Sequence, residues 1–302
     1  MSDPLDPRSF ETRDLGPGHS GAEVIDPREV FASGLDLPRG REREPVSVRE
    51  QGYRLRGSEV RALATIGAFR VVPASDLRDD QGHRGDLRHG DLDRLRRAGL
   101  VRRVAPIEGR RRTALVALTD RGRALLEQHR TPSQEPGQRF YAGPSKPREL
   151  THDSHLYRAY LRSADRLHAQ GARVHRIVLE DDLKREYQQF LQEGNRDQPD
   201  SDGRPTRTLD EVRDWADTHQ LPMLDESVQF PDVRIEYEWP DGRREREDVE
   251  VLTPHYRGAH AAAKARSGFT GYRGSGARVG GSGRSGGGGR PFDPDLADEF
   301  LR

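Results

Sequence analysis

Arginine side chains between residues 87 and 112 carry the clearest chemical signal in this sequence. The guanidinium group is planar and makes paired hydrogen bonds with phosphate oxygens and with the edge of guanine, so clustered arginines are suited to binding and reading DNA. In a helix over residues 87–98, apolar residues would share one side, with basic residues on the other side or its edge. The apolar set is Leu87, Leu92, Leu95 and Ala98, and the opposite set is His89, Asp93, Arg94, Arg96 and Arg97. We therefore predict that this helix presents a basic face to a DNA groove.

Two further elements would support the arginine helix. Residues 58–70 have the apolar spacing of a buried helix, for which Ser58 is a candidate N-cap. Residues 73–80 contain one large apolar residue and can form no more than a short helix. Gly99 is expected to end the arginine helix.

A basic hairpin follows. Residues 100–107 and 111–119 are predicted to be two strands joined at Glu108-Gly109, and a closing helix is capped at Thr119-Asp120. The predicted DNA-binding set, from both helix and hairpin, is Arg88, His89, Arg94, Arg96, Arg97, Arg102, Arg103, Arg110, Arg111 and Arg112.

The segment GDLDRLRRAGLVRRV, with the hairpin and ALTDRGRALLE after it, resembles the recognition helix, wing and closing helix of the bacterial winged-helix superfamily. The resemblance implies a winged helix-turn-helix and DNA binding. Some winged helices bind protein instead, so that alternative stays open.

Local charge favours nucleic-acid binding. Residues 51–130 hold 18 Arg against 10 Asp and Glu, a net charge of +8 in a chain whose total is zero. Positive charge concentrated in this way attracts nucleic acid. Two alternatives remain: the arginines form an ordinary solvated face, or they reflect a GC-rich genome, since Arg outnumbers Lys 48 to 3 along the whole chain.

Two carboxylates make a second candidate site. Asp232 follows Pro231 at the start of a predicted strand, and Glu250 lies between two valines near the end of the next one. This arrangement resembles the core of the PD-(D/E)XK nucleases, in which two carboxylates on adjacent strands converge on a divalent metal ion. The resemblance implies a site for Mg²⁺, which prefers oxygen ligands and can activate a bound water against a phosphate.

The nuclease pattern is incomplete at its lysine. Such cores normally carry a lysine two residues after the glutamate, where this chain has Leu252, and Lys264 on the next predicted helix is the candidate replacement. Glu180 and Glu186 are candidates for a further acidic ligand. The predicted catalytic set is Asp232, Glu250 and Lys264, with Asp232 and Glu250 as metal ligands. Alternatively, both carboxylates are ordinary strand residues, or the nuclease-like domain is degenerate and does not cleave.

Histidines give a weaker metal signal. His152, Asp153 and His155 lie close together in the sequence, as do His255 and His260, but neither set has a third ligand at a telling spacing. We therefore predict surface or packing roles for them.

The combination of features resembles a known family. A winged helix, a linker, the helix LTHDSHLYRAY, a PDV strand with EVL after it, and a lysine-bearing helix are similar to the replication-relaxation family of plasmid and mobile-element proteins. That resemblance covers residues 55–270 and implies DNA binding in plasmid replication or mobilisation, and some relatives are regarded as relaxase-like nucleases. Leu252 stands where the nuclease pattern has a lysine, which counts against DNA cleavage but does not affect the expectation of DNA binding.

Composition indicates several parts, because only 32% of the chain is hydrophobic and Gly and Pro together number 52. We expect an α+β multidomain protein, in which a winged helix-turn-helix precedes an α/β restriction-endonuclease-like domain and both termini are disordered. The predicted parts are a disordered segment at 1–50, the winged helix at 51–130, a linker at 131–147, the nuclease-like domain at 148–270, a Gly- and Arg-rich linker at 271–290 and a docking peptide at 291–302.

The end of the chain is a candidate partner site. A short helix there would place Phe292, Leu296, Phe300 and Leu301 near one face, beyond a glycine-rich tether. Such a peptide could bind a relaxase, a replication protein or a secretion-machinery protein, and a tail without function is the alternative. A homodimer is also left open.

The leading function is therefore a double-stranded DNA-binding protein of a plasmid or mobile element, acting in replication control or conjugative mobilisation. The alternatives are a metal-dependent nicking enzyme, with Mg²⁺ as its cofactor, and a non-catalytic adaptor or transcriptional regulator. No apolar run approaches the ~20 residues that span a bilayer, and the chain has no cysteine, so the expected location is the cytoplasm, without a membrane partner.

Overall fold

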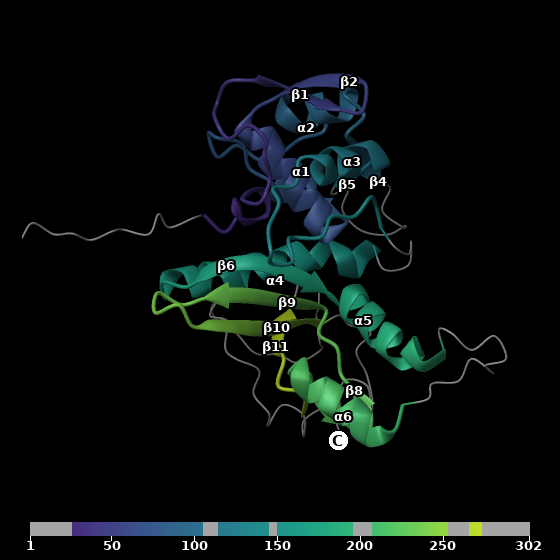
Figure 1. The fold of residues 1–302 in the computed structure, drawn as a ribbon. Coiled ribbons are helices and arrows are strands. Elements are labelled where there is room, and N and C mark those ends of the chain that lie inside the picture. Colours follow the sequence, from purple (N-terminus) through teal and green to yellow (C-terminus); the bar gives the residue numbers. More distant parts are fainter. Residues whose placement is uncertain (1–25, 105–113, 145–149, 196–206, 253–265, 274–302) are drawn as a thin grey trace, which may run out of the picture.

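A computed structural model describes residues 26–104, 114–144, 150–195, 207–252 and 266–273 of the protein. It is a mixed α and β structure with an N-terminal half (residues 26–144) and a C-terminal half (residues 150–273), stacked with helix α4 between the N-terminal elements and the larger sheet (Figure 1). Within the described ranges, no helix has the length and apolar character needed to cross a membrane.

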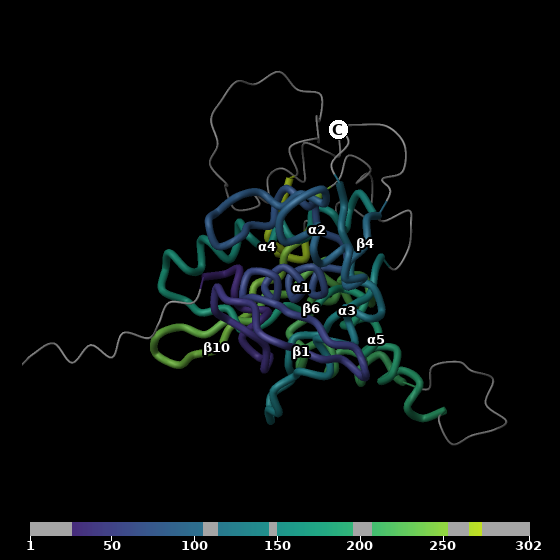
Figure 2. The backbone as a smooth tube through the Cα atoms, turned by 90° about the horizontal axis from the view of Figure 1, so that it is seen from above, coloured from purple at the N-terminus to yellow at the C-terminus, as the bar shows by residue number. Residues whose placement is uncertain are grey.

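The N-terminal half alternates helices with short strands. Its elements are η1 (Val30–Ala32), β1 (Glu44–Val48), β2 (Gln51–Leu55), α1 (Gly57–Phe69), β3 (Val72–Pro73), η2 (Ala74–Asp76), α2 (Gly90–Arg97), β4 (Val101–Val104), β5 (Leu115–Leu118) and α3 (Asp120–Gln128). Strands β1 and β2 form an antiparallel hairpin, and β3, β5 and β4 form an antiparallel sheet in that order. Helix α2 lies beside β4 (Figure 2).

Cap residues account for two of the helix starts. The Thr119 side chain accepts a hydrogen bond from the Gly122 amide, which confirms the predicted cap of α3. The predicted cap of α1 is wrong by two residues: Arg56 is the N-cap, and its amide donates to the Glu59 carboxylate. Ser58 lies inside the helix, where its hydroxyl donates to Asp91.

The C-terminal half contains a four-stranded mixed sheet. Its elements are α4 (Leu150–Ala169), β6 (Arg173–Leu179), α5 (Glu180–Gln192), η4 (Glu193–Asn195), α6 (Leu209–Thr218), β7 (Met223–Leu224), β8 (Ser227–Val228), β9 (Val233–Glu238), β10 (Arg244–Leu252) and β11 (Thr270–Arg273). The strand order is β11-β10-β9-β6, with β11 parallel to β10 and the other pairs antiparallel. Helix α4 covers one face of this sheet (Figure 1).

A buried ion pair on the other face joins the sheet to the end of α6. Arg234 has a side chain only 3% exposed and holds Asp248 through two hydrogen bonds of 2.7 and 2.8 Å. The same guanidinium donates to the backbone carbonyls of His219 and Gln220. Because these carbonyls end a helix, the pair fixes α6 against the sheet.

The prediction that residues 1–50 are mostly disordered is wrong for residues 26–50; residues 1–25 lie outside the described ranges. Phe31 in η1 is 1% exposed, and the hairpin strand β1 buries Val46 and Val48. These apolar side chains are too widely spaced in a charged segment to predict a core from sequence. Phe31 is buried because α1 and α4 supply the surface around it, and β1 packs against α3.

The predicted linker is also part of the folded core as far as it is described, up to residue 144. Phe140 and Tyr141 are buried, and the Gln138 side chain makes two hydrogen bonds with the backbone of Ile177 in β6. Strand β6 is the last strand of its sheet, so Gln138 occupies backbone groups that the sheet leaves open. Residues 131–144 therefore tie the two halves together.

Residues 271–273, predicted to begin the Gly- and Arg-rich linker, belong to a strand instead, and residues 274–290 lie outside the described ranges. Residues 270–273 form β11, where Tyr272 is buried and Val251 of β10 is its parallel partner. A parallel strand has no local pairing signal, since its partner lies far away in the sequence.

Four aromatic rings join the halves into one hydrophobic core. Phe31 lies 5.3 Å from Phe69 and 5.1 Å from Tyr160, and Phe69 lies 5.2 Å from Tyr157, measured between ring centroids. The Tyr160 hydroxyl donates to the Pro27 carbonyl. Buried rings at these separations contribute dispersion and quadrupole attraction beyond their area. The halves are thus packed together and not merely tethered.

Candidate functional site

Helix α2 presents the predicted two-sided character. Leu87, Leu92 and Leu95 are at most 7% exposed, while the side chains of Arg94 and Arg97 are 55% and 71% exposed. The helix is shorter at its start than predicted, so Arg88 precedes it and His89 is its N-cap residue; both are exposed. Apolar burial against α1 therefore directs the arginines outward.

Asp93 differs from its predicted outward position. It is 5% exposed and its carboxylate pairs with Arg96 at 2.8 Å and with Arg97 at 2.6 Å. Hydrogen bonds from Arg96, then the charges and bonds of Arg97, hold the pKa of Asp93 below its ordinary value. Two cations share one anion, so this turn of the helix keeps a net positive charge.

A charge cluster fixes the start of α2, and sequence reasoning missed it. Asp91 accepts hydrogen bonds from Arg56 and Ser58, and buried Glu59 pairs with Arg43 at 3.0 Å and with Arg94 at 3.3 Å. The cluster connects the β1–β2 hairpin region, α1 and α2. Arg43 lies in residues 1–50, whose net charge is negative. The composition of that segment therefore gives no indication that Arg43 takes part in a charge cluster.

The basic hairpin is described only at its base. Strands β4 and β5 pair antiparallel from Val101 opposite Leu118 to Val104 opposite Leu115, and Arg102 and Arg103 are exposed. The predicted tip, with Arg110, Arg111 and Arg112, lies outside the described residues.

The sheet brings the two predicted carboxylates to the same end. Val233 of β9 lies opposite Val249 of β10, so Asp232, just before β9, is at the level of Glu250. Both are buried, at 6% and 2% exposure. The Asp232 Oδ2 atom accepts a 2.7 Å hydrogen bond from the Val251 amide.

His152 is the residue that joins this site unexpectedly. It comes from the first turn of α4, and its Nε2 atom lies 3.0 Å from Oδ2 of Asp232. Burial by itself would lower the pKa of His152, but hydrogen bonds to Asp153 and Asp232 and the charges of both carboxylates outweigh it and raise the pKa to about 10. The predicted surface or packing role for His152 therefore becomes an ion-pairing role. The residues are 80 positions apart, and no sequence spacing indicates the pair.

The described residues do not fit the Mg²⁺ ion that the nuclease resemblance implies. Mg²⁺ requires near-octahedral oxygen ligands at about 2.1 Å, whereas Oδ2 of Asp232 already accepts from an amide and faces an imidazole. Within the described ranges, no group of three or more His, Cys, Asp or Glu side chains is placed to hold a metal ion. In this arrangement the Oδ2 atom of Asp232 is therefore not placed as a metal ligand.

The remaining acid and lysine candidates do not complete the site. The Glu180 carboxylate pairs with Lys184 at 2.8 Å, and only the Glu180 amide reaches Asp232, at its backbone carbonyl. Glu186 is exposed on α5. Lys264, together with His255 and His260, lies outside the described residues.

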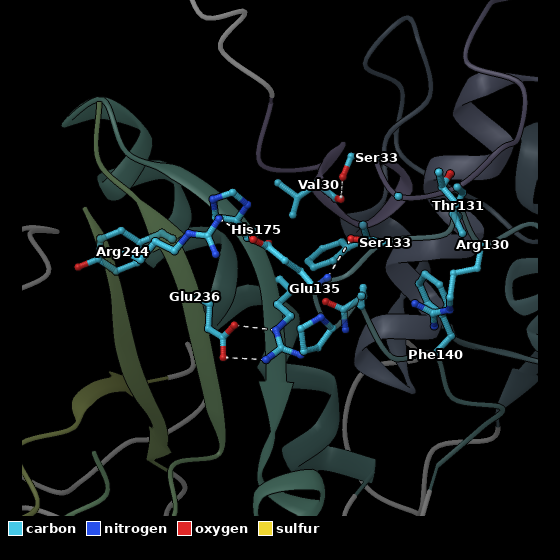
Figure 3. Close-up of a pocket in the computed structure, with 18 of the residues that line it drawn as sticks. Val30, Ser33, Arg130, Thr131, Ser133, Glu135, Phe140, His175, Glu236 and Arg244 are labelled. Carbon is cyan, nitrogen blue, oxygen red and sulfur yellow. Dashed lines mark hydrogen bonds and ion pairs between the residues drawn. The ribbon is translucent and has the colours of Figure 1, made fainter. Parts of the chain in front are cut away.

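A cleft of about 700 Å³ lies between the halves (Figure 3). Ser33, just after η1, and Arg130, just after α3, line one side, and Glu236 and Arg244 of the sheet line the other (Figure 3). Its arginines are largely compensated: Arg176 pairs with Glu236 at 2.6 Å, and Arg244 with Glu135 at 2.8 Å. Arginine and glutamate side chains of the cleft therefore form ion pairs with each other.

Comparison of the chain with protein-family models, with curated proteins and with solved structures finds no match in any of the three.

Proposed function

We propose that the protein binds double-stranded DNA through α2 and the β4–β5 hairpin, in a winged helix-turn-helix arrangement, and serves replication control or mobilisation of a plasmid or mobile element. One observation carries the proposal: α2 buries its apolar side and exposes arginines beside a basic antiparallel hairpin. The element order helix, strand, short helix, helix, hairpin, helix also agrees with the winged-helix resemblance.

The ion pair of Arg97 on α2 leaves this side chain available to DNA. Arg97 is 71% exposed, and Asp93, its buried partner four residues earlier, also pairs with Arg96 at 2.8 Å. A phosphate or a guanine edge offers such a side chain a stronger, charge-assisted bond. Arg97 can therefore turn to DNA while Asp93 keeps Arg96 as its partner.

Replacing Arg94 and Arg97 together by alanine is expected to weaken duplex binding by about 1–3 kcal/mol for each arginine that reads a base. Fluorescence anisotropy with a labelled duplex at several salt concentrations measures this. Arg213→Ala is the control for loss of a positive charge outside α2, because Arg213 is exposed on α6 in the other half, where it pairs with the exposed Asp210. Equal affinity of the double variant, with an unchanged melting temperature, would remove α2 from the proposal.

Replacing Arg110, Arg111 and Arg112 by alanine tests the hairpin. Each phosphate that an arginine neutralises contributes ~0.9 to the slope of log affinity against log salt, so the slope should fall by up to ~2.7 in magnitude. The same anisotropy titration measures it. A slope equal to that of the unmodified protein would show that these side chains do not contact phosphate.

A nicking enzyme remains a second candidate, because the strand register places Asp232 and Glu250 at one level of the sheet. If the protein only binds DNA, supercoiled plasmid incubated with it and Mg²⁺ or Mn²⁺ should show no more nicking than with Asp232→Ala. Agarose gel electrophoresis separates the two forms. Metal-dependent nicking that Asp232→Ala abolishes would establish the enzyme instead.

The adaptor alternative depends on the C-terminal peptide. Phe292, Leu296, Phe300 and Leu301 lie outside the described residues, so docking to a relaxase, replication or secretion-machinery protein stays a prediction. The degenerate nuclease-like domain is likewise a proposal, supported by the strand order of the mixed sheet and by the two buried carboxylates.

A further inference from the structure

One oxygen of Asp232 is already occupied by two partners that the proposed DNA binding does not use. Oδ2 accepts the Val251 amide at 2.7 Å and lies 3.0 Å from His152 Nε2. Asp232 is 6% exposed and Glu250, at the same level of the sheet, is 2% exposed. A carboxylate oxygen has about two lone-pair sites, so Oδ2, which already has two partners, can bind a metal ion only by losing one of them.

His152 reaches this position because of how α4 lies on the sheet. The helix covers β9 and β10, with Ser163 bonded to Glu247 further along, so the first turn of α4 lies at the Asp232 end. Asp153, the next residue, lies 3.6 Å from His152 Nδ1 and gives the ring a second acidic neighbour. Each nitrogen of the imidazole thus faces a carboxylate.

We propose that the His152 ring takes the place of a divalent metal ion at Asp232, so that the protein does not bind Mg²⁺ or Mn²⁺ there until the ring is removed. The ring hydrogen-bonds the oxygen that a metal would ligate, and it supplies the positive partner that a metal would supply. This inference concerns the carboxylate end of the sheet alone and is independent of DNA binding by α2.

Mn²⁺ binding to the full-length protein tests the proposal without requiring activity. Electron paramagnetic resonance reports free Mn²⁺ in titrations of the unmodified protein, His152→Ala, and each of these combined with Asp232→Asn. We expect no Asp232-dependent binding in the unmodified protein, and a gain of one Mn²⁺ per chain in His152→Ala that Asp232→Asn removes. His152→Gln, which retains an N–H donor, should resemble the unmodified protein.

Two outcomes would overturn the proposal. Asp232-dependent Mn²⁺ binding in the unmodified protein that His152→Ala weakens would make His152 a metal ligand. A folded His152→Ala protein without any gain in Mn²⁺ binding would show that the imidazole does not exclude a metal. If His152→Ala does not fold, His152→Leu is used instead, because leucine lacks the N–H donor of the imidazole but fills a similar volume. The same two outcomes then test the proposal.

Discussion

Phe69→Ala should lower the free energy of unfolding by about 3–5 kcal/mol and should do so for both halves of the protein at once. Phe69 is fully buried, and its ring contacts Phe31, Tyr157 and Tyr160 across the junction of α1, η1 and α4. Removing it leaves a cavity in the only aromatic cluster that joins the halves within the described residues, so neither half keeps its packing.

Tryptophan fluorescence makes this experiment selective. The chain has two tryptophans, Trp215 and Trp239, and both lie in the C-terminal half, whereas Phe69 lies in the N-terminal half. Urea unfolding followed by this fluorescence should therefore shift its midpoint in Phe69→Ala. Arg88→Ala, an exposed change in the same half, should remain within about 0.5 kcal/mol of the unmodified protein. An unshifted midpoint in Phe69→Ala would mean that the halves unfold independently.

Stability should fall as the pH rises from neutral to 10, because His152 loses its proton. The pKa of His152 is 6.5 in an ordinary environment and about 10 in the folded protein. A raised folded-state pKa stabilises the protein fully below pH 6.5, and this contribution is lost as the pH rises through 10. The change expected across this range is on the order of 3 kcal/mol, the cost of losing one partner of a buried ion pair.

Comparison with His152→Gln isolates this contribution from other titrating groups. Urea unfolding of both proteins at intervals between pH 6 and 10 should give curves that converge as the pH rises, with the unmodified protein more stable at the acidic end. Asp232→Asn should reduce the same pH dependence, since it removes one of the two carboxylates that raise the pKa of His152. Parallel curves for the unmodified protein and His152→Gln would refute the ion pair.

Local patterns were sufficient for α2 and α3. The spacing of Leu92 and Leu95 predicts the buried side of α2, and Thr119 caps α3 as predicted. The turn at residues 240–242 predicts the hairpin of β9 and β10. Such features depend on neighbours within a few residues, so a sequence carries them directly.

Segments stabilised by distant partners were mispredicted. Residues 26–50 and 131–144 are polar, and their few apolar or amide side chains, such as Phe31 and Gln138, find partners only on α1, α4 and β6. Strand β11 needs β10 beside it in the same direction. Composition averages over a segment and cannot identify the one side chain that anchors it.

The candidate sites likewise combine features that local sequence predicts with features that depend on tertiary contacts. The sequence by itself determined which residues are basic around α2, and that Asp232 and Glu250 belong to neighbouring strands, because helix periodicity and a short hairpin turn set both. Only the tertiary structure decided that Asp93 is buried among those arginines and that His152, 80 residues before Asp232, lies against its carboxylate. Long-range charge pairing depends on how helices lie on a sheet, and that follows from packing of the whole core.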